Sequence, residues 1–198
     1  MQTILGVDEA GRGPLAGPVA VGVVAIAEGF DLVAAFPGLN DSKKLSEKNR
    51  ERIFALLEKT AEVRYAVEFA DARVIDAEGI SKAIRDALSR GVRALVPDPS
   101  DVSVFLDGSL KAPAEYAQET VIGGDGTIPA IMLASVAAKV ARDRLMRELA
   151  KKYPSYGFEK HKGYGTAAHY AALRTHGPCE IHRHTFLHLD RASGTRYG

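Results

Sequence analysis

Hydrophobic positions change period along the chain, and each change marks an expected element. Residues 3–7 and 19–27 are almost continuously apolar and rich in β-branched side chains, which predicts two buried strands. Pro14 and Pro18 bracket the turn between them, so the pair reads as a hairpin with an elaborate turn. Apolar and polar residues alternate over 63–69 and again over 102–106, the period of a strand with one buried face.

The other hydrophobic segments have the helical period. Ser46 is placed to cap a helix that carries Ile53 and Leu57, and residues 80–88 repeat the pattern. An alanine-rich helix is expected from about 130 to 151, and a last helix over 166–176, where Gly177 ends it. Strands cluster in the first two-thirds of the chain and the last third is helical, which predicts an α/β fold: a mixed β-sheet flanked by helices, with a small helical C-terminal extension.

Composition narrows the class of protein. Of 198 residues, 46% are hydrophobic and 26% charged, as in ordinary globular proteins. The single cysteine, Cys179, excludes an internal disulfide and fits a reducing compartment. The N-terminus has no secretory pattern, and the uncharged apolar run over 19–27 is far shorter than the ~20 residues of a membrane helix. We expect a cytoplasmic protein without a membrane partner.

Charge gives a weaker signal. With 26 basic and 25 acidic residues the net charge is +1, which by itself does not support a nucleic-acid partner. Between residues 139 and 162, however, eight Lys and Arg residues stand against three acids. A basic helix is most often just a solvated face, so charge alone leaves this segment open.

Acidic residues carry the chemical signal. Asp8, Asp107 and Asp125 each lie at a strand end or in a glycine turn, and Glu9 follows Asp8. Asp is also common in turns for its own hydrogen bonds, so one Asp-Gly pair means little. Carboxylates that converge repel one another unless a cation intervenes, and oxygen ligands suit Mg²⁺ or Mn²⁺. Such sites favour two-metal hydrolysis of phosphate esters.

Strand geometry sets a condition on the pair at the start of the chain. Neighbouring strand residues point to opposite faces, so Asp8 and Glu9 share one site only if the backbone leaves regular strand geometry there. Gly11 and Gly13 make such a distortion plausible.

Two other segments of the chain suggest alternative sites. Gly11, Gly13 and Ala16 formally satisfy the dinucleotide-binding pattern, but that pattern needs a helix next, and residues 19–27 read as a strand. Late in the chain stand Cys179, His182, His184 and His188, whose C-x₂-H-x-H spacing matches no common zinc site. We expect neither a dinucleotide nor a structural metal at these places.

Several motifs in order resemble one known family. They are "VDEAGRGPLAGPV", "NDSKKLSEKNR", "FLDG", "GGDG" followed by "ASVAAKVARDRLM", and "YGFEKHKGYGTAAH". Together they are similar to bacterial ribonuclease HII, also called type 2 ribonuclease H, over residues 5 to about 186. The resemblance implies a ribonuclease H-like catalytic domain over 1–150, with a helical extension over 151–198 packed on it as a single structural unit.

The resemblance also implies an activity. It assigns metal binding and catalysis to four carboxylates, Asp8, Glu9, Asp107 and Asp125, with Mg²⁺ or Mn²⁺ as cofactor. The enzyme would hydrolyse the phosphodiester 5′ of ribonucleotides in RNA–DNA hybrids, and of single ribonucleotides in duplex DNA, by a two-metal mechanism. It would leave a 3′-hydroxyl and a 5′-phosphate and would remove misincorporated ribonucleotides. The alternative is a catalytically silent module that only binds hybrid duplexes.

Substrate contacts follow from the same motifs. Gly11, Arg12 and Gly13 match the segment that places backbone groups against the ribose 2′-hydroxyl, and Tyr164 matches a tyrosine that packs on the adjacent deoxyribose. Phosphate contacts are expected from a larger set: Lys43, Lys44, Ser135, Lys139 and Arg142. The last three are spaced i, i+4 and i+7, on one helical face. Which of Lys43 and Lys44 faces the nucleic acid stays open.

The chain departs from the family pattern at a few positions, and the resemblance also bears on its partners. Family members often carry Asn and Thr where this chain has "IDAEGISKAI", which touches none of the acids. Arg12 argues against the related ribonuclease HIII, whose turn carries lysine. Binding should be sequence-tolerant and salt-sensitive, because phosphate contacts position a duplex and do not read its bases. We expect a monomer, and the C-terminal "LDRASGTRYG" has no recognisable docking motif for a sliding clamp or polymerase.

Overall fold

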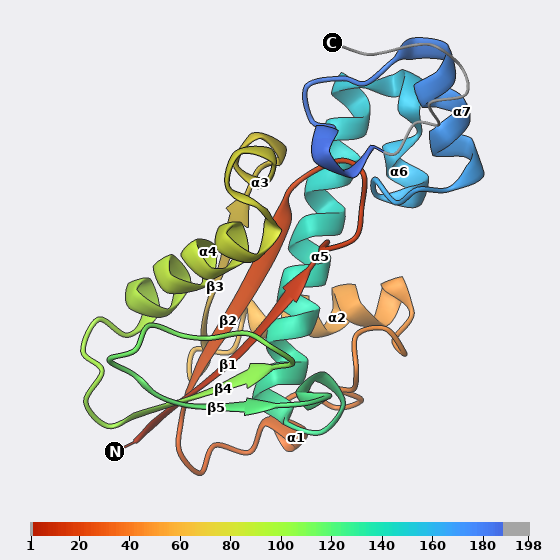
Figure 1. Cartoon of the computed structure of the whole chain (residues 1–198). Coiled ribbons are helices and arrows are strands. Elements are labelled where there is room, and N and C mark those ends of the chain that lie inside the picture. The colour runs from red at the N-terminus through yellow and green to blue at the C-terminus, as the bar shows by residue number, and fades with distance from the viewer. Residues whose placement is uncertain (1, 188–198) are drawn as a thin grey trace.

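The computed structural model describes residues 2–187, and its strands form one mixed sheet (Figure 1). Within these residues the strand order is β3-β2-β1-β4-β5. β1 (Thr3–Ala10) pairs antiparallel with β2 (Val19–Ala27), which pairs antiparallel with β3 (Arg64–Ala70). On its other side β1 runs parallel to β4 (Val102–Asp107), and β4 runs parallel to β5 (Ala117–Val121). The predicted mixed sheet is confirmed.

Helices cover both faces of this sheet. On one face α4 (Ile80–Leu95) packs on Leu5, Val7 and Val23 in one buried cluster. On the other face lie the long α5 (Pro129–Lys152) and, outside it, α2 (Glu47–Leu57), in a second cluster with Val24. Because both faces are covered, β2 is buried along nearly its whole length, which explains why its sequence is continuously apolar.

Close packing of α5 on the sheet depends on a missing side chain. A Cβ at Gly6 would lie 2.2 Å from the backbone carbon of Ala130 on α5. Glycine in the middle of β1 therefore lets the helix axis approach the strand, and with it the residues that α5 carries toward the carboxyl end of the sheet.

The C-terminal part surrounds the far end of α5. It consists of η2 (Pro154–Tyr156), α6 (Phe158–His161), α7 (Ala167–His176) and η3 (His184–Phe186). These elements lie away from β4 and β5 in Figure 1. A third apolar cluster joins them to α5 and to the turn after β1, through residues that include Leu15, Met146, Phe158 and Leu173. The boundary predicted at residue 150 falls inside α5, and that division stays a prediction.

Local signals in the sequence account for most element ends. The Ser46 hydroxyl accepts from the backbone N–H of Asn49 at 3.3 Å, and Thr166 caps α7 in the same way through His169. Several elements were not anticipated: α1 (Leu32–Ala35), α3 (Ala72–Glu78), β5, and α6 with the short η2 and η3. Within residues 2–187, no helix combines the length and the apolar composition needed to span a membrane.

Candidate metal centre and nucleic-acid interface

Three aspartates meet at the carboxyl end of the two central parallel strands. Oxygens of Asp8 (β1), Asp107 (the last residue of β4) and Asp125 (η1, Gly124–Gly126) lie within 4.8 Å of one another. β4 pairs with β1 only as far as Val7, so the two strands separate just where their carboxylates begin. Asp125 is tied to the group because its backbone N–H donates to Asp107 Oδ1 at 3.3 Å. The structure thus brings together three of the four predicted acids.

Burial makes this cluster electrostatically demanding. Asp8 is 5% exposed, and burial raises its pKa from 3.8 to about 7, with the charges of Glu9 and Asp107 adding to the shift. Hydrogen bonds from Ser135 and from the Glu9 backbone N–H, 2.7 Å from Asp8 Oδ1, act in the opposite direction. An ionised Asp8 is therefore costly without a compensating cation.

A cationic group already lies against the cluster. Lys43 Nζ is 2.7 Å from Asp125 Oδ2, and this hydrogen bond raises the pKa of Lys43. Lys44 instead lies 3.9 Å from Asp41. Of the two lysines left open by the sequence, Lys43 is the one directed at the site.

The donor set fits a hard divalent ion. Its ligands are carboxylate oxygens, without nitrogen or sulfur, and these oxygens converge on one point. The ammonium group of Lys43 already binds one of the carboxylates. Mg²⁺ and Mn²⁺ prefer such ligands. Among the residues that the structure describes, this is the one group of three or more acids, histidines or cysteines close enough to share an ion.

Glu9 departs from the expectation. The ladder between β1 and β2 continues without interruption, pairing Asp8 with Gly22 and Glu9 with Val21. The distortion that the two glycines made plausible does not occur in this stretch, because β2 holds the end of β1 in regular geometry through Ala10. Glu9 consequently points to the other face of the sheet, where Arg12 donates to its Oε1 at 2.9 Å. Its role as a metal ligand stays a prediction.

The glycine turn after β1 is held from beneath by a buried arginine that the sequence analysis missed. Arg183 is fully buried and donates to the carbonyls of Gly11 (2.7 Å), Arg12 (2.9 Å) and Gly17 (2.9 Å). Burial lowers its pKa to about 9. The only signal for it in the sequence is the "IHRHTF" segment, where it stands between two histidines.

Arg142 corrects a prediction. It was expected to contact phosphate, but it is fully buried and donates to the carbonyls of Pro18 (2.8 Å) and Ala16 (3.3 Å). Its Nη1 is buried without a hydrogen-bond partner in the described residues. Gly11 has φ +92°, and a Cβ there would lie 2.0 Å from Arg142 Nε. Arg142 therefore shapes the turn and is not available to the substrate.

The rest of that helical face is also mostly internal. Ser135 is 4% exposed and shares a 2.8 Å hydrogen bond with the Ser42 hydroxyl, so the predicted phosphate contact fails for it too. Lys139 is partly exposed and bonds Asp143 at 2.8 Å. The i, i+4, i+7 spacing did place these residues on one face, but that face points at the protein interior beside Asp8.

Tyr164 is exposed beside this region. Its side chain is 43% exposed, and the Lys139 ammonium and the Arg142 guanidinium each lie 5.9 Å from its ring centre. Its backbone carbonyl accepts from His169 Nδ1 at 2.9 Å, and His169 Nε2 lies 3.0 Å from His182 Nε2. The chain thus presents the tyrosine at the surface while anchoring its backbone below.

Two members of the late cysteine and histidine set, Cys179 and His182, belong to this network. The Cys179 backbone N–H donates to His182 Nδ1 at 2.9 Å, and burial lowers the pKa of His182 to about 4. These contacts leave both buried rings neutral, each with one donating and one accepting nitrogen. His188, the last member of the predicted set, lies outside the described residues.

Known proteins match this chain over nearly its whole length. The family model for ribonuclease HII matches residues 5–189. The chain is 48% identical to a ribonuclease HII of Endomicrobium trichonymphae over 184 residues, which is 92% of this chain and 84% of the relative. It is 50% identical to one of Azorhizobium caulinodans over 186 residues, 94% and 69% of the two chains. Among solved structures, the PCNA:RNase HII complex from Archaeoglobus fulgidus superposes with a TM-score of 0.77 at 22% identity, covering 95% of this chain and 96% of the other.

Proposed function

Because the chain belongs to the ribonuclease HII family, and is therefore a type 2 ribonuclease H that acts as a metal-dependent endonuclease, we propose its substrate and its site in more detail. The proposed substrates are RNA–DNA hybrids and duplex DNA with single embedded ribonucleotides. Cleavage occurs 5′ of the ribonucleotide and leaves a 3′-hydroxyl and a 5′-phosphate. The observation that carries this proposal is the aspartate cluster next to a glycine turn in which Arg12 and Gly13 are exposed.

The proposed metal site consists of Asp8, Asp107 and Asp125. Glu9 is a further proposed ligand, for which its carboxylate must leave Arg12 and the end of β1 must depart from regular strand geometry. Two bound Mg²⁺ or Mn²⁺ ions would supply Lewis acidity, polarising the phosphate and lowering the pKa of water. Asp8 and Asp107, on adjacent strands, and Asp125, in η1, would hold these ions in fixed positions. Lys43, which is mostly exposed beyond its bond to Asp125, adds positive charge next to the developing charge on phosphate.

Recognition of the ribonucleotide is assigned to the turn and the tyrosine. Gly13 has open space where a side chain would be, so nucleic acid can approach its backbone closely. The 2′-hydroxyl is what distinguishes RNA from DNA, and backbone groups of residues 11–13 would bind it. Tyr164 offers an exposed ring for the neighbouring deoxyribose. Lys139 is the remaining phosphate contact of its helical face, and Lys44 is a weaker candidate because it faces Asp41.

The cellular setting is also a proposal. Removal of ribonucleotides from DNA takes place where the DNA is, which in bacteria such as the relatives above is the cytoplasm. The solved Archaeoglobus fulgidus structure is a complex with PCNA, and a sliding clamp is accordingly a candidate partner here, with the chain itself a monomer. The C-terminal residues that would be tested first for such docking lie outside the described residues.

The deciding experiment uses an end-labelled DNA duplex with one ribonucleotide, beside an all-DNA duplex, with Mg²⁺, with Mn²⁺ and with chelator. We expect one metal-dependent cut on the 5′ side of the ribonucleotide, abolished by Asp107→Asn. Asp101→Asn is the matched control, because Asp101 is exposed, lies outside the cluster and has a backbone φ of +55° that asparagine tolerates.

Either alternative would change the proposal. Tight binding of the hybrid without cleavage under any metal favours the silent binding module. Cleavage of long hybrid alone, with the single-ribonucleotide duplex intact, would mean that residues 11–13 and Tyr164 do not read the junction.

A further inference from the structure

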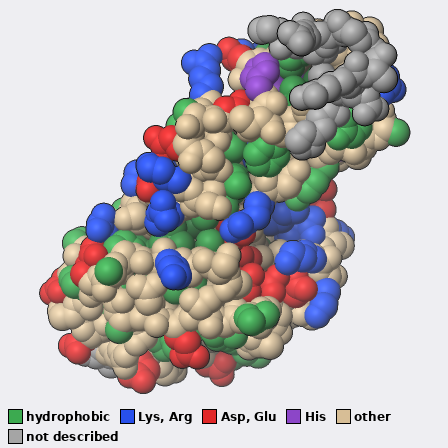
Figure 2. Space-filling view, in the orientation of Figure 1, with side chains coloured by type: hydrophobic (Ala, Val, Ile, Leu, Met, Phe, Trp, Pro, Cys, Tyr) green, Lys and Arg blue, Asp and Glu red, His purple; other side chains and the backbone are tan. Residues whose placement is uncertain are grey.

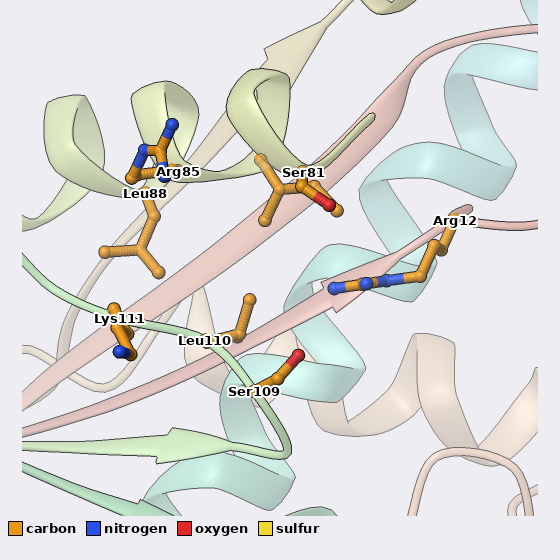
Figure 3. Close-up of a pocket in the computed structure, with 8 residues that line it drawn as sticks. Arg12, Ser81, Arg85, Leu88, Ser109, Leu110 and Lys111 are labelled. Carbon is orange, nitrogen blue, oxygen red and sulfur yellow. The ribbon is translucent and has the colours of Figure 1, made fainter. Parts of the chain in front are cut away.

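A hollow of about 280 Å³ opens on the α4 side of the sheet (Figure 3), and none of the three aspartates lines it. Its walls come from three places: the turn after β1, the first half of α4, and the loop after β4. Apolar side chains line part of it, namely Ile84, Leu88 and Leu110. Polar groups complete the lining: Arg12, Ser81, Arg85, Ser109 and Lys111.

The charge of the hollow is one-sided. Three of its lining residues are cationic and none is acidic, although one of the three, Arg12, is paired with Glu9 at 2.9 Å. Asp86, next to Arg85 on α4, pairs with Lys82 at 2.6 Å instead. No carboxylate of residues 2–187 lies within ion-pair distance of Arg85 or Lys111, and both are exposed. Unpaired cations grouped around a hollow favour an anionic ligand.

Two further features suit a phosphate. Ser81 and Ser109 add hydroxyl donors to the lining, and α4 starts beside Ser81 without a side-chain cap, which leaves the positive end of the helix dipole open. The apolar residues between these groups match the ring of a deoxyribose, which carries no charge. The backbone of a nucleic-acid strand repeats a phosphate and a sugar, so it can contact both the cationic and the apolar residues of the hollow.

The hollow is joined to the metal centre by the chain itself. Ser109 follows Asp107 by two residues, and Arg12 holds Glu9, the neighbour of Asp8. Figure 3 shows Arg12 extending from the end of β1 over this region toward the loop that carries Ser109. The glycine turn therefore lies between two basic areas, with Lys43 on the α5 side and the hollow on the α4 side.

Surface charge agrees with a duplex across the turn. Lys and Arg side chains gather across the middle of the face seen in Figure 2, with acidic side chains next to them. A duplex has two backbones, one on each side of a groove. If the turn contacts the sugars in that groove, the strand over the carboxylates is cut and the other strand passes over the hollow.

We propose that this hollow binds the sugar–phosphate backbone of the strand that is not cut. Arg85 and Lys111 neutralise its phosphates, and the apolar residues support a sugar. The inference rests on the proposed function for the orientation of the duplex. The hollow would make the enzyme require an intact partner strand, because a single strand could occupy only one of the two basic areas.

The test compares the double variant Arg85→Ala/Lys111→Ala with wild type. Both side chains are exposed, so the fold is expected to persist, and neither belongs to the cluster that performs the cut. Binding to duplex DNA should weaken at least tenfold at physiological salt while kcat at saturation stays within about twofold. Loss of two phosphate contacts should also reduce the slope of log K against log salt by about 1.8. Lys48→Ala/Lys59→Ala is the matched control, since it removes two exposed charges on and after α2.

A second experiment tests which of the two DNA strands the hollow binds. Neutral methylphosphonate linkages are placed one at a time in the uncut strand or in the cut strand. Wild type should lose affinity at one or two positions of the uncut strand, and the double variant should lose none there. Sensitivity confined to the cut strand, or a double variant that binds with unchanged affinity and salt slope, would overturn the proposal.

Failure of the two proposals can be told apart. Binding is measured by fluorescence anisotropy on all-DNA and single-ribonucleotide duplexes in chelator, so the hollow is tested even if no cut occurs. Absence of cleavage by wild type with normal methylphosphonate sensitivity would refute the proposed substrate and leave the hollow standing. Normal cleavage with no sensitivity to methylphosphonates in the uncut strand would support the proposed substrate and refute the role of the hollow.

Discussion

Replacing Asp8 by asparagine should stabilise the metal-free protein while destroying its activity. The carboxyl is buried, and burial raises its pKa from 3.8 to about 7. Asparagine has the same shape, keeps an oxygen to accept the 2.7 Å bond from the Glu9 N–H, and cannot ionise. The variant therefore removes a charge that is unfavourable in the native state, where it is buried, and not in the unfolded state, where water solvates it.

The sign of the pH dependence follows from the two pKa values. Below pH 3.8 the carboxyl is protonated in both states, and the wild type and the variant should be equally stable. As the pH rises toward 7 the unfolded chain releases the proton and the native chain holds it, so the wild type loses stability steadily. Above about pH 7 the loss is complete.

The magnitude follows from the same shift. At about 1.4 kcal/mol for each pKa unit, a shift from 3.8 to about 7 corresponds to about 4 kcal/mol, which is an upper limit because neighbouring groups respond. A cation that binds the native state opposes this loss in the wild type, since ligand binding adds stability by mass action. Mg²⁺ should therefore narrow or reverse the difference between the two proteins.

Urea unfolding gives the free energy of unfolding of both proteins. It is measured in chelator at pH 4 and pH 8, and again at pH 8 with Mg²⁺. We expect Asp8→Asn to exceed wild type by 1 to about 4 kcal/mol at pH 8 in chelator and to match it at pH 4. Asp107→Asn is the comparison within the cluster, and it should gain less because Asp107 is only half-buried. An Asp8→Asn protein that is no more stable than wild type at pH 8 would show that burial does not penalise this carboxylate.

Other predictions concern the residues beneath the site. Gly11→Ala places a Cβ 2.0 Å from Arg142 Nε at a φ of +92°, so we expect about 2 kcal/mol less stability and at least tenfold slower cleavage. A variant that unfolds at the same urea concentration as the wild type would contradict this. Arg183→Met leaves three carbonyls of the turn, two of them buried, without a donor and should cost about 2–3 kcal/mol, with cleavage of the single-ribonucleotide duplex falling further than that of long hybrid. The pKa of His182 is lowered to about 4 from 6.5, so its neutral form stabilises the fold above pH 6.5 and about 3 kcal/mol is lost as the pH falls to 4; acid titration of His182→Gln should lack this loss.

Sequence patterns determined the frame of this protein because they report on local geometry. Alternation over 102–106 matches the buried and half-buried positions of β4, and the capping hydroxyl of Ser46 lies where the first turn of α2 needs an acceptor. Asp107 was placed at a strand end by its position after the alternating run. A period and a cap are properties of a few neighbouring residues, and tertiary contacts rarely override them in long, regular segments.

Tertiary structure alone decided which way the site residues point. The spacing of Ser135 and Arg142 put them on one face of a helix, but only packing against β1 turned that face inward and buried both. The continued pairing of β1 with β2 sent Glu9 to the opposite face from Asp8. β5, with its exposed and non-alternating residues, exists because the edge of β4 offers it backbone partners.

Arg183 shows the physical reason most plainly. It contacts Gly11, 172 residues earlier, through a carbonyl that any residue would supply, so no local pattern at either end predicts the bond. The carboxylates, the glycine turn and the helix faces were present in the sequence as types and spacings. Their distances, their burial and the pKa of Asp8 arise only when segments far apart in the chain exclude water together.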